Sequence, residues 1–198
     1  MHKSAKANVD LRRGELLDAA AFLFATKGFH ATGMRELAQH LTIKAGSLYY
    51  HISSKEQLLR EVCEIGMEQL RLSVDEAVAS SSGLGDTIRA LVLGHARLIR
   101  RYGHFLRCYQ NEYMNLPADA GEKMRRELSG FHRRIDDLLA RAIESGECPA
   151  TLDVKTARLV IISMFYQLSR VDQEGNQLLL DETARSISDI LINGLATR

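Results

Sequence analysis

The chain of 198 residues has no tryptophan and only two prolines, Pro117 and Pro149. Runs of valine, isoleucine and threonine, which favour strands, are also absent, so the sequence predicts an all-α protein. No segment approaches the roughly 20 uninterrupted apolar residues that a membrane-spanning helix needs. The first ten residues, MHKSAKANVD, carry positive charge without the apolar stretch of a secretory signal. We therefore expect a cytoplasmic protein.

Cysteine is scarce as well, and its placement argues against two kinds of site. Cys63, Cys108 and Cys148 lie far apart and form no C-x-x-C pair. An odd number of isolated cysteines predicts free thiols rather than a disulfide framework. His40 and His51 have no cysteine pair nearby with which to hold zinc. We expect no metal and no cofactor.

The net charge of +1 conceals an uneven distribution. Residues 1–60 hold nine lysines and arginines against five acidic residues, whereas residues 61–198 hold 17 basic and 20 acidic residues. Four of the seven histidines also fall in the first sixty positions. A positive amino-terminal third predicts a polyanionic partner such as nucleic acid, although an excess of this size also arises by chance scatter.

Residues 29–56 carry the most informative pattern. A start signal at Thr32-Gly33 is followed by apolar residues at helical spacing, namely Met34, Leu37, Ala38 and Leu41. After a turn, a second short helix is expected over residues 44–51, with Leu48 as its one aliphatic anchor. This layout is typical of a helix-turn-helix whose second helix enters the DNA major groove. The alternative is the solvated surface of an ordinary helical hairpin.

A third helix is expected directly after this motif. Ser53 and Glu56 have the spacing of a capping box. The positive amide end of the new helix, with Lys55 in its first turn, would then form a phosphate clamp. Gly46 would let the backbone approach a phosphate or a base closely.

Four motifs with fixed spacing run through this region: L-x-x-A-A-x-x-L-F-x-x-x-G-F (residues 16–29), T-x-M-R-x-L-A (32–38), G-S-L-Y-Y-H (46–51) and S-K-E-x-L-L (54–59). Together they resemble the amino-terminal domain of the TetR family of transcriptional repressors. Two positions depart from the family pattern, which usually has Gly at Thr42 and often Ser at Lys44. We expect Thr42 to be uncomfortable in a left-handed turn conformation and to supply part of the missing helix cap.

The candidate DNA-binding residues divide by the part of DNA they would reach. Arg35 is the best candidate to read a base, because an arginine can bind guanine O6 and N7 together; a surface arginine paired with Glu36 or Gln39 is the alternative. Lys44 and Ser47 would also reach base edges, while Thr32, Tyr49, Tyr50, His51 and Lys55 would contact phosphates. The resemblance implies DNA contacts at Arg35, Tyr49, Tyr50, His51 and Lys55.

The rest of the chain is expected to form helices only. The first helix should run from Asp10 to Lys27, with Gly28 as its stop. Further helices are expected over residues 54–80, 86–103, 104–116, 118–145, 154–170 and 181–195, with a turn at 174–176. Gly146 should stop the helix at 118–145, and Asp153 and Asp181 should cap the last two helices. The helix at 154–170 is apolar nearly all round, which predicts burial on more than one side. We predict two domains: 1–53, a three-helix DNA-binding domain, and 54–198, a helical ligand-binding and dimerisation domain.

These features predict a homodimeric DNA-binding regulator, most simply a repressor, that binds a palindromic operator. The resemblance implies that a small-molecule inducer, a small hydrophobic ligand such as an acyl-CoA, binds in the carboxy-terminal domain. The residues that could line its pocket, or else form plain core, are Phe105, Tyr109, Glu112, Tyr113, Phe131, Met164 and Phe165.

Two other classes of protein remain as alternatives. An enzyme is not expected, because no catalytic triad spacing or glycine-rich phosphate loop is present; His95 and His104 are more simply structural. A helical adaptor without DNA binding would leave the tyrosine-histidine cluster unexplained.

Overall fold

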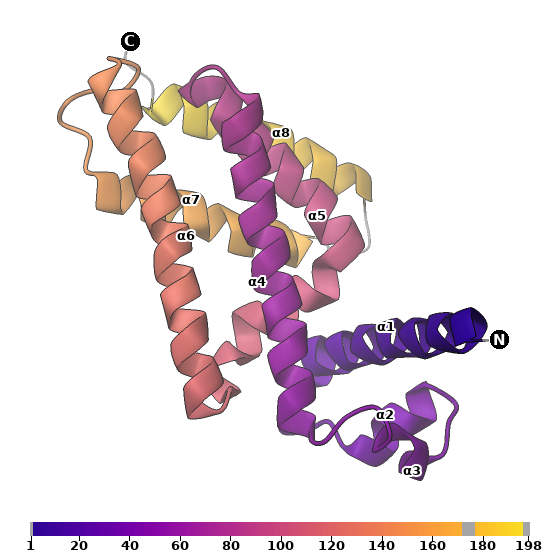
Figure 1. Ribbon diagram of the computed structural model, residues 1–198. Helices are drawn as coiled ribbons and strands as arrows, with labels where there is room; N and C mark the ends of the chain where they lie inside the picture. Colours follow the sequence, from indigo (N-terminus) through magenta and orange to yellow (C-terminus); the bar gives the residue numbers. More distant parts are fainter. Residues whose placement is uncertain (1, 172–176, 196–198) are drawn as a thin grey trace. The chain divides into compact units, whose positions relative to one another are not determined.

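The computed structural model describes residues 2–171 and 177–195, and Figure 1 labels their elements. Within these residues there are eight α-helices, one 3-10 helix and no strand, which confirms the all-α prediction. The helices are α1 (His2–Lys27), α2 (Met34–His40), α3 (Ala45–Leu48), α4 (Lys55–Ser80), α5 (Leu84–Glu112), η1 (Tyr113–Asn115), α6 (Ala118–Glu144), α7 (Val154–Val171) and α8 (Gln177–Leu195). None of these described helices is both long and apolar enough to cross a bilayer.

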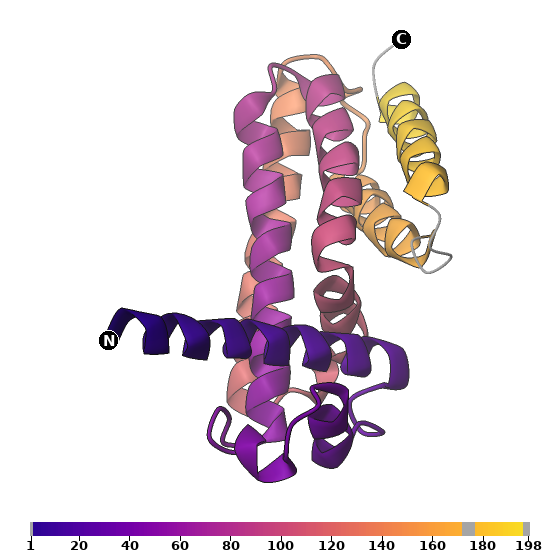
Figure 2. The same cartoon turned by 90° about the vertical axis from the view of Figure 1, so that its right-hand side faces the viewer.

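The chain divides into two compact units, and the first contains residues up to 67 together with 104–124. It holds α1, α2, α3, the beginning of α4, the end of α5, η1 and the beginning of α6. Within it, α2 and α3 lie beside the start of α4, and α1 crosses that part of α4 (Figure 2). Its buried apolar residues include Leu16, Leu23, Phe24, Leu37, Leu48 and Leu58. Each fully buried side chain of this size stabilises the fold by about 1.5–3 kcal/mol.

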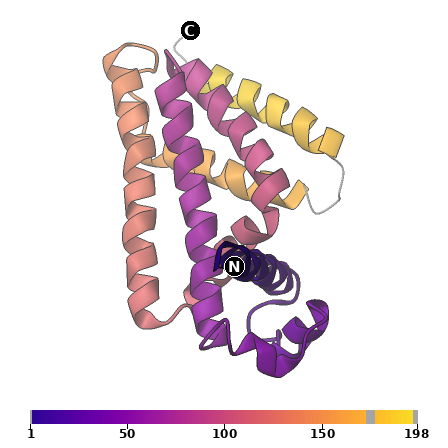
Figure 3. The ribbon, with the colours of Figure 1, turned by 45° about the vertical axis from the view of Figure 1, so that its right-hand side comes forward.

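The second unit contains residues 68–103 and those from 125 onward. It holds the rest of α4, α5 and α6 together with α7 and α8, which lie side by side (Figure 3). One face of α7 is buried through Ala157, Ile161, Met164, Phe165, Leu168 and Ser169. The opposite face exposes Leu159, Val160 and Tyr166 by 59%, 50% and 42%. The predicted burial of α7 on more than one side is therefore wrong for a single chain.

Several predicted helix ends are confirmed. Gly28 and Gly146 follow α1 and α6 with φ of +90° and +79°, a conformation that glycine adopts without strain. The Asp153 carboxylate accepts a hydrogen bond from the Thr156 N–H at 2.7 Å and so caps α7. That bond also lowers the pKa of Asp153.

Other helix ends differ from the prediction. α1 begins at His2 rather than Asp10, because no proline or glycine stands between these residues. α8 begins at Gln177, so Asp181 lies inside the helix and pairs with Arg100 instead of capping. α5 is continuous across residues 103 and 104, where one helix was predicted to end and the next to begin. The helix is kinked beside this point, at Tyr102 (φ −127°, ψ 20°). The turn predicted at residues 174–176 lies outside the described residues.

The predicted domain boundary between residues 53 and 54 divides the chain by function. The compact units divide it by packing, and the first unit includes residues on both sides of that boundary. The boundary therefore stays a prediction.

Candidate DNA-binding interface

The second helix of the helix-turn-helix is held by its neighbours rather than by its own length. α3 has only four residues, far fewer than the roughly 12 that an isolated helix needs for stability. Its anchor, Leu48, is completely buried, as predicted. The turn before it is fixed by the Ile43 N–H, which donates to the Ala38 carbonyl at 3.0 Å. The predicted helix over 44–51 is shortened, because residues 49–51 lie in a turn.

Around Leu48, the same segment presents polar and aromatic side chains to solvent. Tyr49 is 59% exposed and Tyr50 is 92% exposed. Lys44, Gly46 and Ser47 are exposed too, and His51 is partly exposed. A tyrosine left this open loses the stabilisation of burial, but its hydroxyl can bond a phosphate oxygen. The structure thus brings six of the predicted DNA contacts together on one short segment.

Arg35 lies on α2 and is exposed. Its predicted alternative partner, Glu36, instead forms an ion pair with Lys27 at the end of α1. The hydrogen bond from Lys27 lowers the pKa of Glu36. The carboxylate neighbouring Arg35 is therefore already engaged by another cation.

Lys55 and Thr32 have contacts inside the protein. The Lys55 ammonium donates to the carbonyls of Phe29 and Thr32 at 2.9 and 3.0 Å, and it lies 4.2 Å from the centre of the Phe29 ring. The Thr32 side chain is buried and donates to the Gly28 carbonyl at 2.9 Å. Both residues tie the loop between α1 and α2 to α4. Thr32 is not among the residues that we propose to contact DNA, because its hydroxyl is out of reach.

The cap of α4 is displaced by one residue from the predicted Ser53–Glu56 box. The helix begins at Lys55, which makes Ser54 the N-cap. The Ser54 hydroxyl oxygen accepts a hydrogen bond from the Gln57 N–H at 3.1 Å. In return, the Gln57 side-chain oxygen accepts from the Ser53 N–H at 2.8 Å. Ser53 thus belongs to the turn before α4.

Thr42, between α2 and α3, adopts the left-handed conformation with φ of +56°, as the sequence predicted. It gives no cap, however: the N-cap of α3 is Lys44, and no side chain bonds there. Replacing Thr42 by glycine should raise the free energy of unfolding by about 1 kcal/mol, because left-handed backbone strains a β-branched residue. Urea unfolding of Thr42→Gly measures this, with Thr42→Ala as control, since alanine keeps most of the strain. A glycine variant no more stable than the alanine variant would contradict the prediction.

The seven candidate ligand-binding residues fall in the two compact units. In the first, Phe105 and Tyr109 are buried, and the rings of Tyr109 and Tyr113 lie 5.8 Å apart. The Glu112 carboxylate accepts a hydrogen bond from the Asn115 side chain at 2.6 Å. Their role in ligand binding stays a prediction.

The remaining three candidates belong to the second unit. Phe131, Met164 and Phe165 are buried, and the two phenylalanine rings lie 6.2 Å apart. Packing of this kind suits a hydrophobic core as well as the wall of a ligand pocket.

Comparison with known proteins places this chain in a family. The profile of the bacterial regulatory proteins of the tetR family matches residues 16–62, and that of the tetracyclin repressor-like carboxy-terminal domain matches residues 81–195. The chain belongs to the TetR family. The first match covers the helix-turn-helix and the cap of α4, so the resemblance in the four sequence motifs is confirmed.

Individual relatives of this TetR-family protein agree. The HTH-type transcriptional repressor KstR2 of Rhodococcus jostii is 30% identical over 187 residues, which cover 94% of this chain and 92% of the relative. The structure of the ketosteroid regulator KstR2 of Mycobacterium tuberculosis has a TM-score of 0.87 at 26% identity, with 94% and 96% of the chains covered. AibR, in complex with isovaleryl coenzyme A and operator DNA, shares the fold at 20% identity, with a TM-score of 0.78 and coverage of 93% and 98%.

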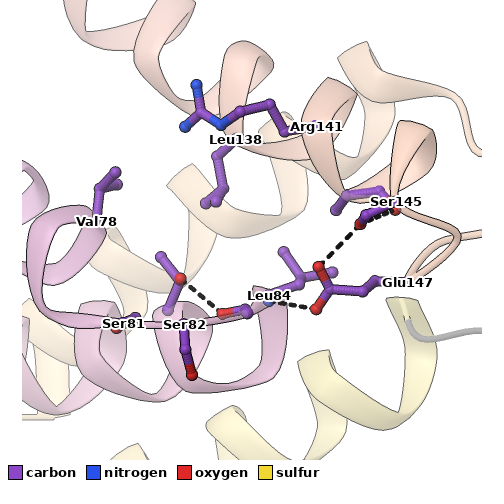
Figure 4. Close-up of a pocket in the computed structure, with 11 residues that line it drawn as sticks. Val78, Ser81, Ser82, Leu84, Leu138, Arg141, Ser145 and Glu147 are labelled. Carbon is purple, nitrogen blue, oxygen red and sulfur yellow. Dashed lines mark hydrogen bonds between the residues drawn. The ribbon is translucent and has the colours of Figure 1, made fainter.

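A hollow of about 250 Å³ lies in the second unit of this TetR-family protein, between the ends of α4 and α6 and the start of α5 (Figure 4). None of the seven candidate ligand residues lines it. Its Glu147 carboxylate accepts hydrogen bonds from the Leu84 N–H at 2.7 Å and the Ser145 hydroxyl at 2.9 Å. These groups satisfy one another, so Glu147 acts here as a helix cap for α5.

Sequence reasoning missed one group of contacts beside the helix-turn-helix. Arg13 on α1 bonds the main chain of His51 and the carboxylate of Glu61 on α4. A signal was available: Arg13 precedes the buried Leu16 by three positions, and Glu61 follows the buried Leu58 by three. Each charge therefore borders a buried helical face, where charged residues are seldom found without a partner.

Proposed function

We propose that this protein is a homodimeric transcriptional repressor that binds a palindromic operator and leaves it when a small hydrophobic ligand binds. The family supports the DNA-binding regulator, and the KstR2 relatives are named repressors. The observation that carries the proposal is the recognition segment at residues 44–51. There a buried Leu48 fixes a short helix, and the turn that follows it presents Tyr50, at 92% exposure, to solvent. Such a surface suits the sugar-phosphate backbone and base edges of the major groove.

Two substitutions should separate base reading from phosphate contact. Arg35→Ala should weaken operator binding about tenfold and relax base preference at one position, because a bidentate arginine–guanine pair contributes about 1–3 kcal/mol of discrimination. Tyr50→Ala should weaken binding to every sequence alike. Both are measured by fluorescence anisotropy on duplexes selected by the wild-type protein and on variants with single base changes.

The matched control for these two is Met114→Ala, which removes a side chain that is 73% exposed in the same compact unit but outside the helix-turn-helix. It should bind like the wild type. If Arg35→Ala keeps wild-type affinity and base preference, Arg35 reads no base. If the wild type shows no salt-dependent binding to any DNA, the proposed function is wrong.

The dimer that we propose uses the exposed apolar face of α7. One short recognition helix makes too few contacts to select a genomic site, and a two-fold dimer doubles them. Leu159, Val160 and Tyr166 are open to solvent on α7, and α8, which packs against it, exposes Ile190 by 70%. Pairing such faces between two copies would bury them in a four-helix interface.

Leu159→Glu should therefore weaken the dimer about tenfold or more, because each copy would bury a charge without a partner. Light scattering across micromolar concentrations measures the effect, and Leu72→Glu, at a 44% exposed position on α4, is the control. A wild type that remains monomeric at these concentrations would rule out the dimer.

We propose that the ligand is hydrophobic and that it binds in the carboxy-terminal part of the chain. The support is the set of buried aromatic residues described above, together with AibR, whose structure holds isovaleryl coenzyme A. A ligand switches the population only if it binds one conformation several kcal/mol more tightly than the other. Release of selected DNA by acyl-CoAs, free fatty acids, steroids and aromatic drugs is the test. If all four classes fail and native mass spectrometry detects no co-purifying compound, the sensor role is wrong.

A further inference from the structure

Arg13 connects three elements of the first compact unit: α1, the recognition segment and α4. It projects from α1, and one guanidinium nitrogen, Nη1, donates to the main-chain carbonyl of His51, the last residue of the recognition segment. The other, Nη2, donates to both carboxylate oxygens of Glu61 on α4, at 2.5 Å. The two side chains are only 29% and 26% exposed. Hydrogen bonds between charged groups in partly buried sites are among the strongest that side chains form.

The network continues from Glu61 back to the same segment. The Gln57 side-chain amide donates to Glu61 at 3.0 Å. The Gln57 oxygen accepts from the N–H and the hydroxyl of Ser53 at 2.8 and 2.6 Å. Residues 51–53 are thereby fixed from α1 on one side and from α4 on the other.

This anchoring matters because the recognition segment has few other supports. α3 contributes one fully buried side chain, Leu48. Tyr49 and Tyr50 come after α3, in a turn whose hydrogen bonds run from the Tyr50 N–H to the Ser47 carbonyl at 3.4 Å and from the His51 N–H to the Leu48 carbonyl at 2.9 Å. Because His51 closes this turn, the position of its carbonyl helps to set where the two tyrosines point.

We propose that Arg13 is a positioning residue for DNA reading: through the His51 carbonyl it orients the recognition segment without touching DNA itself. The inference rests on the proposed function. The alternative role for a basic residue beside the recognition segment is a direct contact with a DNA phosphate. The Glu61 carboxylate, however, already neutralises the guanidinium, and both of its terminal nitrogens donate to protein oxygens.

Arg13→Gln and Arg13→Lys test the role. Glutamine removes the ion pair, whereas lysine keeps the charge but lacks the fork that reaches two acceptors in different directions. Arg60→Gln is the matched control: Arg60 lies in the same unit, and its ion pair with Asp119 at 2.8 Å joins α4 to α6 rather than to the recognition segment. Circular dichroism melts establish whether each variant is folded. If Arg13→Gln is unfolded, Arg13→Lys decides the outcome.

Each protein is titrated with duplexes of about 40 base pairs selected on the wild type, long enough for two half-sites one helical turn apart, and with sheared genomic DNA, at several salt concentrations. Both Arg13 variants should bind the selected duplexes about tenfold more weakly, because the charge-assisted bond that orients the segment is lost. Binding to sheared DNA and the salt slope should stay as in the wild type, and Arg60→Gln should match the wild type throughout.

Two results would overturn the inference. One is wild-type affinity of both Arg13 variants for the selected duplexes. The other is a salt slope lowered by about 0.9, which marks the loss of one phosphate contact. A wild type that binds neither kind of DNA would instead refute the proposed function, so the two failures are distinguishable.

Discussion

Replacing Gly66 by alanine should lower the free energy of unfolding by about 2 to 3 kcal/mol, the upper part of the range for overpacked interiors. Gly66 is a buried residue in the middle of α4. A Cβ atom there would lie 2.7 Å from the main-chain oxygen of Phe105 and 3.1 Å from Cβ of Tyr109, both on α5. The nearest obstacle is backbone, which cannot rotate away as a side-chain tip can. The two helices would have to separate along this contact.

Replacing Gly130 on α6 by alanine should instead raise the free energy of unfolding. A Cβ there would meet only the guanidinium nitrogens of Arg134 and Arg133, at 3.7 and 3.8 Å. Alanine in an open helix interior is more favourable than glycine by about 0.5–1 kcal/mol. Urea unfolding of both variants measures the contrast. A Gly66→Ala variant as stable as Gly130→Ala would mean that α4 and α5 are not in close contact in solution.

The close approach at Gly66 also explains two of the three cysteines. Cys63 and Cys108 are one turn away on the same two helices and are completely buried. The hydrogen bond between their thiols, and then burial, raise the pKa of Cys108 well above its ordinary value. A thiol that resists ionisation reacts slowly with oxidants. The free thiols predicted from the sequence are confirmed, and these two serve packing.

The helices themselves could be predicted because their signals are local. The apolar spacing of α2, the glycine after α1 and the aspartate before α7 each act within one turn of chain, so neighbouring residues suffice to read them. Thr42 was placed correctly in a strained turn for the same reason. The errors at the starts of α1 and α8 arose where a good capping residue, Asp10 or Asp181, lies inside a helix that continues past it.

The contacts of the candidate site could be predicted less well, because they join residues far apart in the sequence. Lys55 has the residue type of a phosphate ligand, yet its ammonium bonds two carbonyls more than 20 positions away. Arg13 finds its partners at positions 51 and 61. By contrast, the exposure of Tyr49 and Tyr50 follows from a helix too short to bury them, which the sequence does reveal.

His95 on α5 is the other group with a large expected effect. It is buried, and its ring lies 4.4 Å from that of Phe165 on α7. Its Nε2 lies 3.2 Å from the Phe165 carbonyl oxygen, which can only accept, so Nε2 carries the proton of the neutral ring. Its Nδ1 has no hydrogen-bond partner. Burial lowers the pKa of His95 from 6.5 to about 4, since a charged ring would lose its hydration.

Acidification should therefore destabilise the protein before its carboxylates titrate. The unfolded chain takes up a proton at His95 as the pH falls through 6.5, whereas the folded chain does so only near 4, so the stabilisation is complete above 6.5 and is lost below it. Between about pH 7.5 and about pH 5 this difference amounts to about 2 kcal/mol. Urea unfolding at both pH values measures it in the wild type and in His95→Gln, whose amide can still donate to the Phe165 carbonyl but does not titrate. The variant should lose most of the pH dependence.

His132→Gln is the control. Burial lowers the pKa of that half-exposed histidine too, but its ring is less desolvated, so this variant should keep most of the pH dependence of the free energy of unfolding. If the free energy of unfolding changes equally between the two pH values in the wild type and in His95→Gln, His95 is not the group that resists protonation.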